Sequence, residues 1–167
     1  MPINQPRKVI VLVVDRLKPS QIGAYGNTCH HTDAMDRIAS QGILFDQAVS
    51  PVANLEASYK RLLNVASTNI ASGSPVEAWL AAVSRAGVET TFMCDREWLA
   101  NSQVLSEFDS VSHLSVKSLD RLASRISQTS LARFFAQTID RLESIPSRSL
   151  AWIDCSGMAG QWDAPYE

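Results

Sequence analysis

The sequence is short of the residues that mark several functional classes. It has 3 cysteines and 3 histidines among 167 residues, and its formal net charge is −2. This charge leaves no basic footprint for nucleic acid or for an anionic membrane surface. The cysteines are odd in number, widely spaced and without a CxxC pair, which argues against a disulfide framework and a zinc site and favours a reducing compartment. They are Cys29, Cys94 and Cys155.

Apolar runs long enough to cross a membrane are also missing. The run at residues 9–14, VIVLVV, follows Arg7 and Lys8 in the manner of a signal peptide. It is too short, however, it meets Asp15 at once, and no small-residue cleavage site follows it. We therefore expect no targeting segment, no transmembrane segment and a cytoplasmic location. A length of 167 residues with 46% hydrophobic and 19% charged residues predicts one soluble domain with its own core.

Four short apolar segments predict the strands of a sheet. A β-branched run without alternation, such as residues 9–14, is typical of a parallel strand covered on both faces. The second and third segments alternate enough to lie nearer an edge of the sheet. The predicted strands are Lys8–Asp15, Ile43–Val49, Val88–Cys94 and Leu150–Cys155.

Helical patterns separate these strands. The best start signal is a capping box at residues 74–77 with Pro75 at the first helical position, and Gly87 ends that helix. The segment 108–119 is ambiguous, and the other predicted helices are Thr32–Gln41, Leu55–Val65 and Leu131–Glu143. The alternation predicts an α/β fold with a mainly parallel sheet of about four strands and helices on both faces.

Three acids, Asp15, Asp95 and Asp154, end or follow predicted strands. In open α/β sheets, ligands bind outside the carboxyl ends of the strands. This placement would suit a cation or an acid–base pair. It would equally suit polar residues that end strands and meet solvent, so both interpretations stay open.

One further pattern extends over most of the chain. The segments VIVLVVDRLKPSQIGAYGN, HTDAMDRIASQGILFDQAVS, SPVEAWLAAVSRAGVETTFMCD and LAWIDCSGMAGQWDAPYE resemble, in order, the N-terminal portion of the sulfatase family in the alkaline phosphatase superfamily. In the first two segments the matching positions are Val11, Leu12, Asp15, Leu17, Gly23, Tyr25, Gly26, Asn27, Thr32, Asp36, Arg37, Ala39, Gly42, Phe45 and Ala48. The resemblance implies a partial alkaline-phosphatase-like fold, with residues 1–167 as the N-terminal portion of a single domain.

The resemblance also implies a mechanism. Sulfatases carry a CxPSR or SxPSR segment whose first residue becomes formylglycine and attacks the ester sulfur as a hydrated aldehyde. A divalent cation, usually calcium, lies beside it on acids from the end of the first strand and from a later part of the chain. Basic side chains neutralise the sulfate oxygens, because the charge on those oxygens must be stabilised as the bond breaks.

This chain departs from the family pattern at the nucleophile. Alignment places Ala53 or Leu55 at that position, and neither side chain is a nucleophile. Ser58 has no adjacent activating base and is predicted to be a structural helix serine. No cysteine has a comparable context. We therefore predict that the chain contains no catalytic residue.

The predicted metal site is incomplete as well. Arg16 follows Asp15 where the family usually has a second acid, and Ala159 stands where the last motif has a histidine. His30 and His31 are predicted to be surface residues. Asp15 is expected to pair with Arg16 or a neighbouring base or to face solvent, and Asp95 or Asp154 would give it too few partners to hold an ion. No cofactor is predicted, although an intact family member would hold calcium.

Two hypotheses about function follow. In the first, the chain is sulfatase-like but has no hydrolase activity as given, since it ends at Glu167 before the family's second set of acids and its basic residues. In the second, it is a non-catalytic α/β binding or regulatory module. We expect no nucleic-acid or membrane partner. Self-association is expected through sheet or helix faces that the chain itself does not cover.

Overall fold

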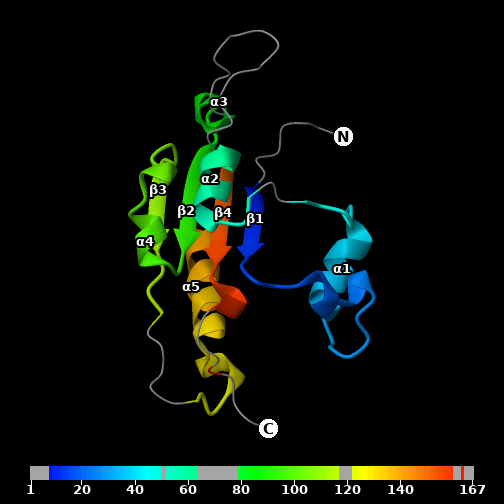
Figure 1. The fold of residues 1–167 in the computed structure, drawn as a ribbon. Coiled ribbons are helices and arrows are strands. Elements are labelled where there is room, and N and C mark those ends of the chain that lie inside the picture. The colour runs from blue at the N-terminus through cyan, green and yellow to red at the C-terminus, as the bar shows by residue number, and fades with distance from the viewer. Residues whose placement is uncertain (1–7, 50–51, 64–78, 117–121, 160–162, 164–167) are drawn as a thin grey trace.

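A four-stranded sheet lies at the centre of the computed structural model, which describes residues 8–49, 52–63, 79–116, 122–159 and 163. The strand order is β1-β4-β2-β3, and all three neighbouring pairs are parallel (Figure 1). The strands are β1 (Lys8–Val14), β2 (Glu89–Cys94), β3 (Ser110–His113) and β4 (Ser149–Cys155). The prediction of a mainly parallel α/β sheet of about four strands is confirmed.

Helices pack on both faces of this sheet, as predicted. In Figure 1, α2 lies in front of the sheet and α5 behind it. The helices are α1 (Asp33–Gln41), α2 (Leu55–Leu63), α3 (Trp79–Arg85), α4 (Glu97–Ala100) and α5 (Ser130–Ser144). The capping box at residues 74–77 lies outside the described residues. No helix of the described residues is long and apolar enough to cross a membrane.

The core has two layers, one on each face of the sheet. The side chains of β4, which lies between β1 and β2, point alternately to the two faces. Leu150 and Trp152 join one cluster with residues of α2, α3, β2 and the segment after α4. Ala151, Ile153 and Cys155 join the second cluster, which packs against α5. Every residue of β4 is buried, as expected for a central strand of a parallel sheet.

The predicted strand at Ile43–Val49 is wrong. The structure places no strand there, and Ile43, Phe45 and Val49 are exposed. The hydroxyl of Tyr25 donates to the backbone oxygen of Phe45 over 2.9 Å, so this backbone bonds within the N-terminal part of the chain rather than to a neighbouring strand. The fourth strand is instead β3, which lies in the segment 108–119 that the sequence left ambiguous.

The residues that carry the family resemblance in the N-terminal part hold a loop onto α1. Asp36 of α1 accepts from the backbone N–H of Ala24 at 2.7 Å and from the hydroxyl of Thr32 at 3.0 Å. Thr32 in turn accepts from the backbone N–H of Gly23 at 2.7 Å. A Cβ on Gly23 would lie 2.4 Å from an Asp36 oxygen, so only glycine fits there. The matching glycine, threonine and aspartate therefore form a structural unit.

One side of β1 is uncovered within the described residues. Val11 and Val13 pack against the first core cluster, whereas Ile10 and Leu12 point to the other face and are about half exposed. In Figure 1, α1 lies beyond β1 and covers neither face of the sheet. These two residues are therefore partly exposed apolar side chains on one face of β1. Self-association stays a prediction.

Truncation of Phe134 tests the layer formed by α5. Its side chain is 1% exposed and packs in the second core cluster, so Phe134→Ala is expected to lower the free energy of unfolding by about 3–5 kcal/mol. Ile139→Ala on the same helix is the control, because this residue is 56% exposed and should change stability by about 0.5 kcal/mol or less. Urea unfolding followed by circular dichroism measures both. Equal losses would contradict this packing of α5.

Candidate functional site

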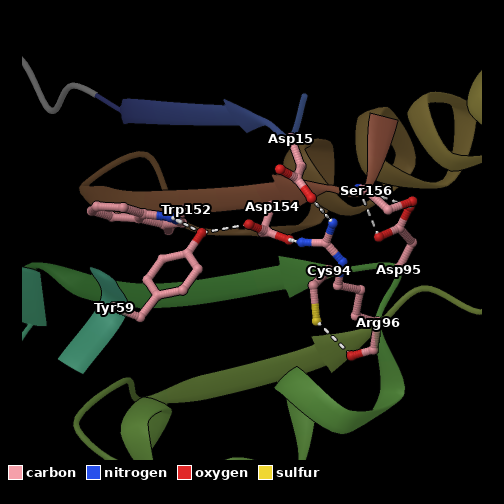
Figure 2. Close-up of polar contacts among 8 residues, drawn as sticks. All are labelled: Asp15, Tyr59, Cys94, Asp95, Arg96, Trp152, Asp154 and Ser156. Carbon is pink, nitrogen blue, oxygen red and sulfur yellow. Dashed lines mark hydrogen bonds and ion pairs between the residues drawn. The ribbon is translucent and has the colours of Figure 1, made fainter. Parts of the chain in front are cut away.

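Three acids and one arginine meet at the carboxyl edge of the sheet, which is the candidate site (Figure 2). Asp154 lies within β4, with Val13 of β1 and Cys94 of β2 as its register partners. Asp15 directly follows the end of β1, and Asp95 directly follows the end of β2. The parallel register therefore brings together residues that are far apart in sequence.

The guanidinium of Arg96 bridges two of these acids. Nη2 bonds to Oδ2 of Asp15, and Nη1 donates to Oδ1 of Asp154 at 3.1 Å. The Arg96 side chain is 12% exposed and that of Asp154 is completely buried. Removal of one partner of a buried ion pair lowers the free energy of unfolding by roughly 3–5 kcal/mol, because the other charge stays buried without compensation. Arg96 therefore ties the end of β1 to β4.

The second oxygen of Asp154 is also occupied. Tyr59 of α2 donates its hydroxyl to Oδ2 of Asp154 over 2.5 Å, and the indole N–H of Trp152 donates to the same hydroxyl at 3.3 Å. Figure 2 shows this line of contacts from Trp152 through Tyr59 and Asp154 to Arg96 and Asp15. Both carboxylate oxygens of Asp154 therefore bond to side chains of the protein.

Asp95 is used differently, because it holds the chain that leaves β4. Its carboxylate accepts the backbone N–H of Ser156 at 3.0 and 3.1 Å and the Ser156 hydroxyl at 2.6 Å. The next residue, Gly157, has a φ of 53°. A Cβ there would lie 2.7 Å from Cγ1 of Val14 and 3.0 Å from the backbone oxygen of Asp15, so the close approach to β1 requires glycine.

Burial shifts the pKa values of the groups in this cluster. It is the main reason that the pKa of Asp154 is raised above its ordinary value, against the opposing effects of the Tyr59 hydrogen bond and the Arg96 charge. Burial and then the charge of Asp154 raise the pKa of Tyr59. Burial also raises the pKa of the Cys94 and Cys155 thiols to about 11. The phenol and both thiols are therefore neutral at physiological pH and are poor nucleophiles.

The two residues aligned with the sulfatase nucleophile, Ala53 and Leu55, place no reactive group at the carboxyl edge. Ala53 is exposed, and Leu55 packs against the first core cluster at the start of α2. The hydroxyl of Ser58 donates to the backbone oxygen of Asn54 at 2.9 Å, within the first turn of the helix. The side chain of α2 that does reach the edge is Tyr59.

The residues at the edge do not fit a calcium ion as they are arranged. Calcium needs several oxygen ligands, but Asp15 and Asp154 bond to a cation of the protein and Asp95 bonds to Ser156. Within the described residues, no group of three or more His, Cys, Asp or Glu side chains is arranged to hold a metal ion. His30 and His31 are exposed in the loop before α1.

The base that contacts Asp15 is Arg96, whereas the sequence singled out Arg16. Arg16 is exposed, has a φ of 60°, and forms no ion pair in the described part of the structure. Sequence reasoning named neither Arg96 nor Tyr59 as a site residue. One signal was present: an Asp-Arg pair stands at the end of both the first and the third predicted strand segment, at residues 15–16 and 95–96. It could not show which arginine points inward.

Comparison with known proteins gives a likeness of fold. No protein-family model and no curated protein matches the chain. A crystal structure of the C-terminal periplasmic domain of EcEptC from Escherichia coli in complex with Zn matches with a TM-score of 0.63 and 12% identity. The match covers 91% of this chain and 44% of that one. A second structure of the same domain gives a TM-score of 0.60, also with 12% identity, and covers 94% and 44%.

These values show the fold alone. The chain has a partial alkaline-phosphatase-like α/β fold, and it spans less than half the length of the structures that it matches. The likeness therefore supports the fold that the sequence resemblance implied, and membership of the alkaline phosphatase superfamily stays a prediction. The assignment to the sulfatase family within it stays a prediction.

The raised pKa of Tyr59 predicts a loss of stability at alkaline pH. Above a pH of about 10, the unfolded chain releases the phenol proton while folded Tyr59 retains it, so the free energy of unfolding falls by up to roughly 1.4 kcal/mol per pH unit. Tyr59→Phe should remove this part of the decline. It should also cost about 1–3 kcal/mol at neutral pH, through the lost bond to buried Asp154. Urea unfolding at several alkaline pH values gives both numbers.

The control for this prediction is Thr138→Val. Thr138 also has a buried hydroxyl, which donates to the backbone oxygen of Phe134 at 2.8 Å but does not ionise in this range. Its removal should lower stability and leave the slope against pH unchanged. If Tyr59→Phe gives the same slope as the unmodified chain, the phenol is not the group responsible.

Proposed function

We propose that this chain is the N-terminal portion of a sulfatase-like domain and has no ester hydrolase activity as given. The observation that carries the proposal is the place of Tyr59. It reaches the carboxyl edge from the segment where the family has its nucleophile, and its neutral phenol donates to Asp154. Tyr59 is also buried and its hydroxyl accepts from the indole N–H of Trp152, so the phenol is not presented to an ester from solvent.

The other hydroxyls and thiols near the edge support the same proposal. Ser58 bonds to the backbone of α2, and the thiols of Cys94 and Cys155 are buried with raised pKa values. Ser156 is the hydroxyl that deserves a direct test, because it donates to the carboxylate of Asp95 at the edge itself. A carboxylate that accepts a serine proton is the arrangement from which a nucleophile could form.

A hydrolysis assay tests the proposal. Nitrophenyl sulfate and nitrophenyl phosphate should be hydrolysed by the purified chain no faster than by buffer, with or without added calcium, magnesium or zinc. Ser58→Ala and Ser156→Ala are assayed in parallel. Turnover that persists through purification and is lost in either variant would overturn the proposal and would identify the nucleophile.

The alternative function is a non-catalytic α/β binding or regulatory module. It shares the absence of activity, so the assay does not separate the two. The reading frame after codon 167 does: acidic and histidine-bearing motifs there would favour a degenerate or incomplete hydrolase domain, and a stop codon would favour the module. A cytoplasmic, reducing location is part of either proposal and rests on the cysteine pattern of the sequence.

We also propose that the chain self-associates through β1. Within the described residues the outer edge of β1 has no strand partner, and Ile10 and Leu12 beside it are about half exposed. An unpaired strand edge is a template for pairing with another chain. If two copies of β1 paired antiparallel about a twofold axis, the unpaired backbone N–H and C=O groups of each copy would bond to those of the other. The proposed partner at this edge is therefore a second copy of the chain.

Sedimentation velocity at increasing protein concentration tests this pairing. The unmodified chain should form a dimer, and Leu12→Lys should shift it to the monomer, because a lysine beside the strand edge opposes pairing. Ile126→Lys is the control, since Ile126 is 70% exposed and distant in sequence from β1. A monomer at all concentrations, or a dimer that Leu12→Lys leaves intact, would contradict the proposal.

A further inference from the structure

Three acids gather at the carboxyl edge, and within the described residues the ion pairs made there are those of Arg96. Asp15, Asp95 and Asp154 come from the ends of three adjacent strands, and the charges of Asp15 and Asp95 both act on Asp154. Arg96 is the base that bonds to two of them. Asp154 is completely buried, and an ionised carboxylate in that position requires a cation close by.

The guanidinium of Arg96 is held as a fixed ion rather than as a flexible surface charge. Its two terminal nitrogens bond to different carboxylates, one within β4 and one just after β1, which the planar fork of arginine permits. The Arg96 side chain is only 12% exposed. The backbone oxygen of Arg96 also accepts from the thiol of Cys94 at 3.4 Å, so the residue is restrained at both ends.

We propose that Arg96 is the built-in cation of the carboxyl edge. Its guanidinium takes the position between Asp15 and Asp154 that a divalent metal ion would need, so a metal ion can bind there only when the guanidinium is gone. This proposal concerns the charge of the edge. It does not depend on whether the chain hydrolyses esters, and the failure of one proposal leaves the other standing.

Removal of the guanidinium should convert the edge into a metal site. In Arg96→Gln the carboxylates of Asp15 and Asp154 lose their cation, and carboxylate oxygens are ligands for calcium, magnesium and zinc. Calorimetric titration with each metal chloride alone should show binding to Arg96→Gln at least tenfold tighter than to the unmodified chain. The double variant Arg96→Gln, Asp15→Asn should lose this gain, because it removes one ligand.

Two further variants separate this role from a general effect of lost charge. Arg16→Gln removes a positive charge from the residue next to Asp15, but Arg16 is exposed and forms no ion pair in the described residues, so metal binding should stay as in the unmodified chain. Arg96→Lys keeps a cation at the edge and should bind metal no more tightly than the unmodified chain. Its melting temperature should lie between those of the unmodified chain and Arg96→Gln, because lysine lacks the two-pronged contact.

The outcomes decide the proposal in either direction. Metal binding to the unmodified chain as tight as to Arg96→Gln would overturn it, and so would a folded Arg96→Gln that binds none of the three metals. If Arg96→Gln does not fold alone, circular dichroism is recorded with each metal chloride added. The proposal then requires that at least one metal restores the folded spectrum of Arg96→Gln but not that of the double variant, and no recovery with any metal overturns it.

Discussion

The carboxylate of Asp154 sets the constraint on which the carboxyl edge depends. It is completely buried in the central strand of a parallel sheet, with β1 on one side and β2 on the other. A carboxylate cannot remain there without hydrogen bonds and a compensating charge, because burial disfavours the ionised form. Its two oxygens therefore require partners from elsewhere in the chain, and Tyr59 and Arg96 supply them.

This requirement links four parts of the chain that are far apart in sequence. Tyr59 brings α2 onto β4, Arg96 brings the turn after β2 onto the same strand, and Asp15 extends the contact to the end of β1. Gly157 then allows the chain after β4 to pass close to Val14 and Asp15. At this edge, where α/β sheets commonly bind ligands, the carboxylates of Asp15, Asp95 and Asp154 bond to side chains of the protein.

The family resemblance has a physical meaning even though the positions aligned with the nucleophile hold no nucleophilic side chain. Gly23, Thr32 and Asp36 match the sulfatase pattern, and in this structure they hold the loop before α1 through hydrogen bonds. Such residues preserve a backbone arrangement rather than a reaction. This explains how the chain can keep an alkaline-phosphatase-like fold while the positions aligned with the nucleophile, Ala53 and Leu55, are inert.

The sequence alone determined the fold class, three of the four strands and the presence of acids at one edge of the sheet. Apolar runs and helix signals are local, so β1, β2, β4, α1 and α5 could be predicted within one or two residues of their bounds. Only the tertiary structure decided that the segment 43–49 stays outside the sheet and that β3 joins it. A strand must lie beside another strand edge to pair, and β3 lies beside β2. It also decided that Arg96 points inward while Arg16 stays exposed. Both follow an aspartate at the end of a strand, and only the packing around β4 distinguishes them.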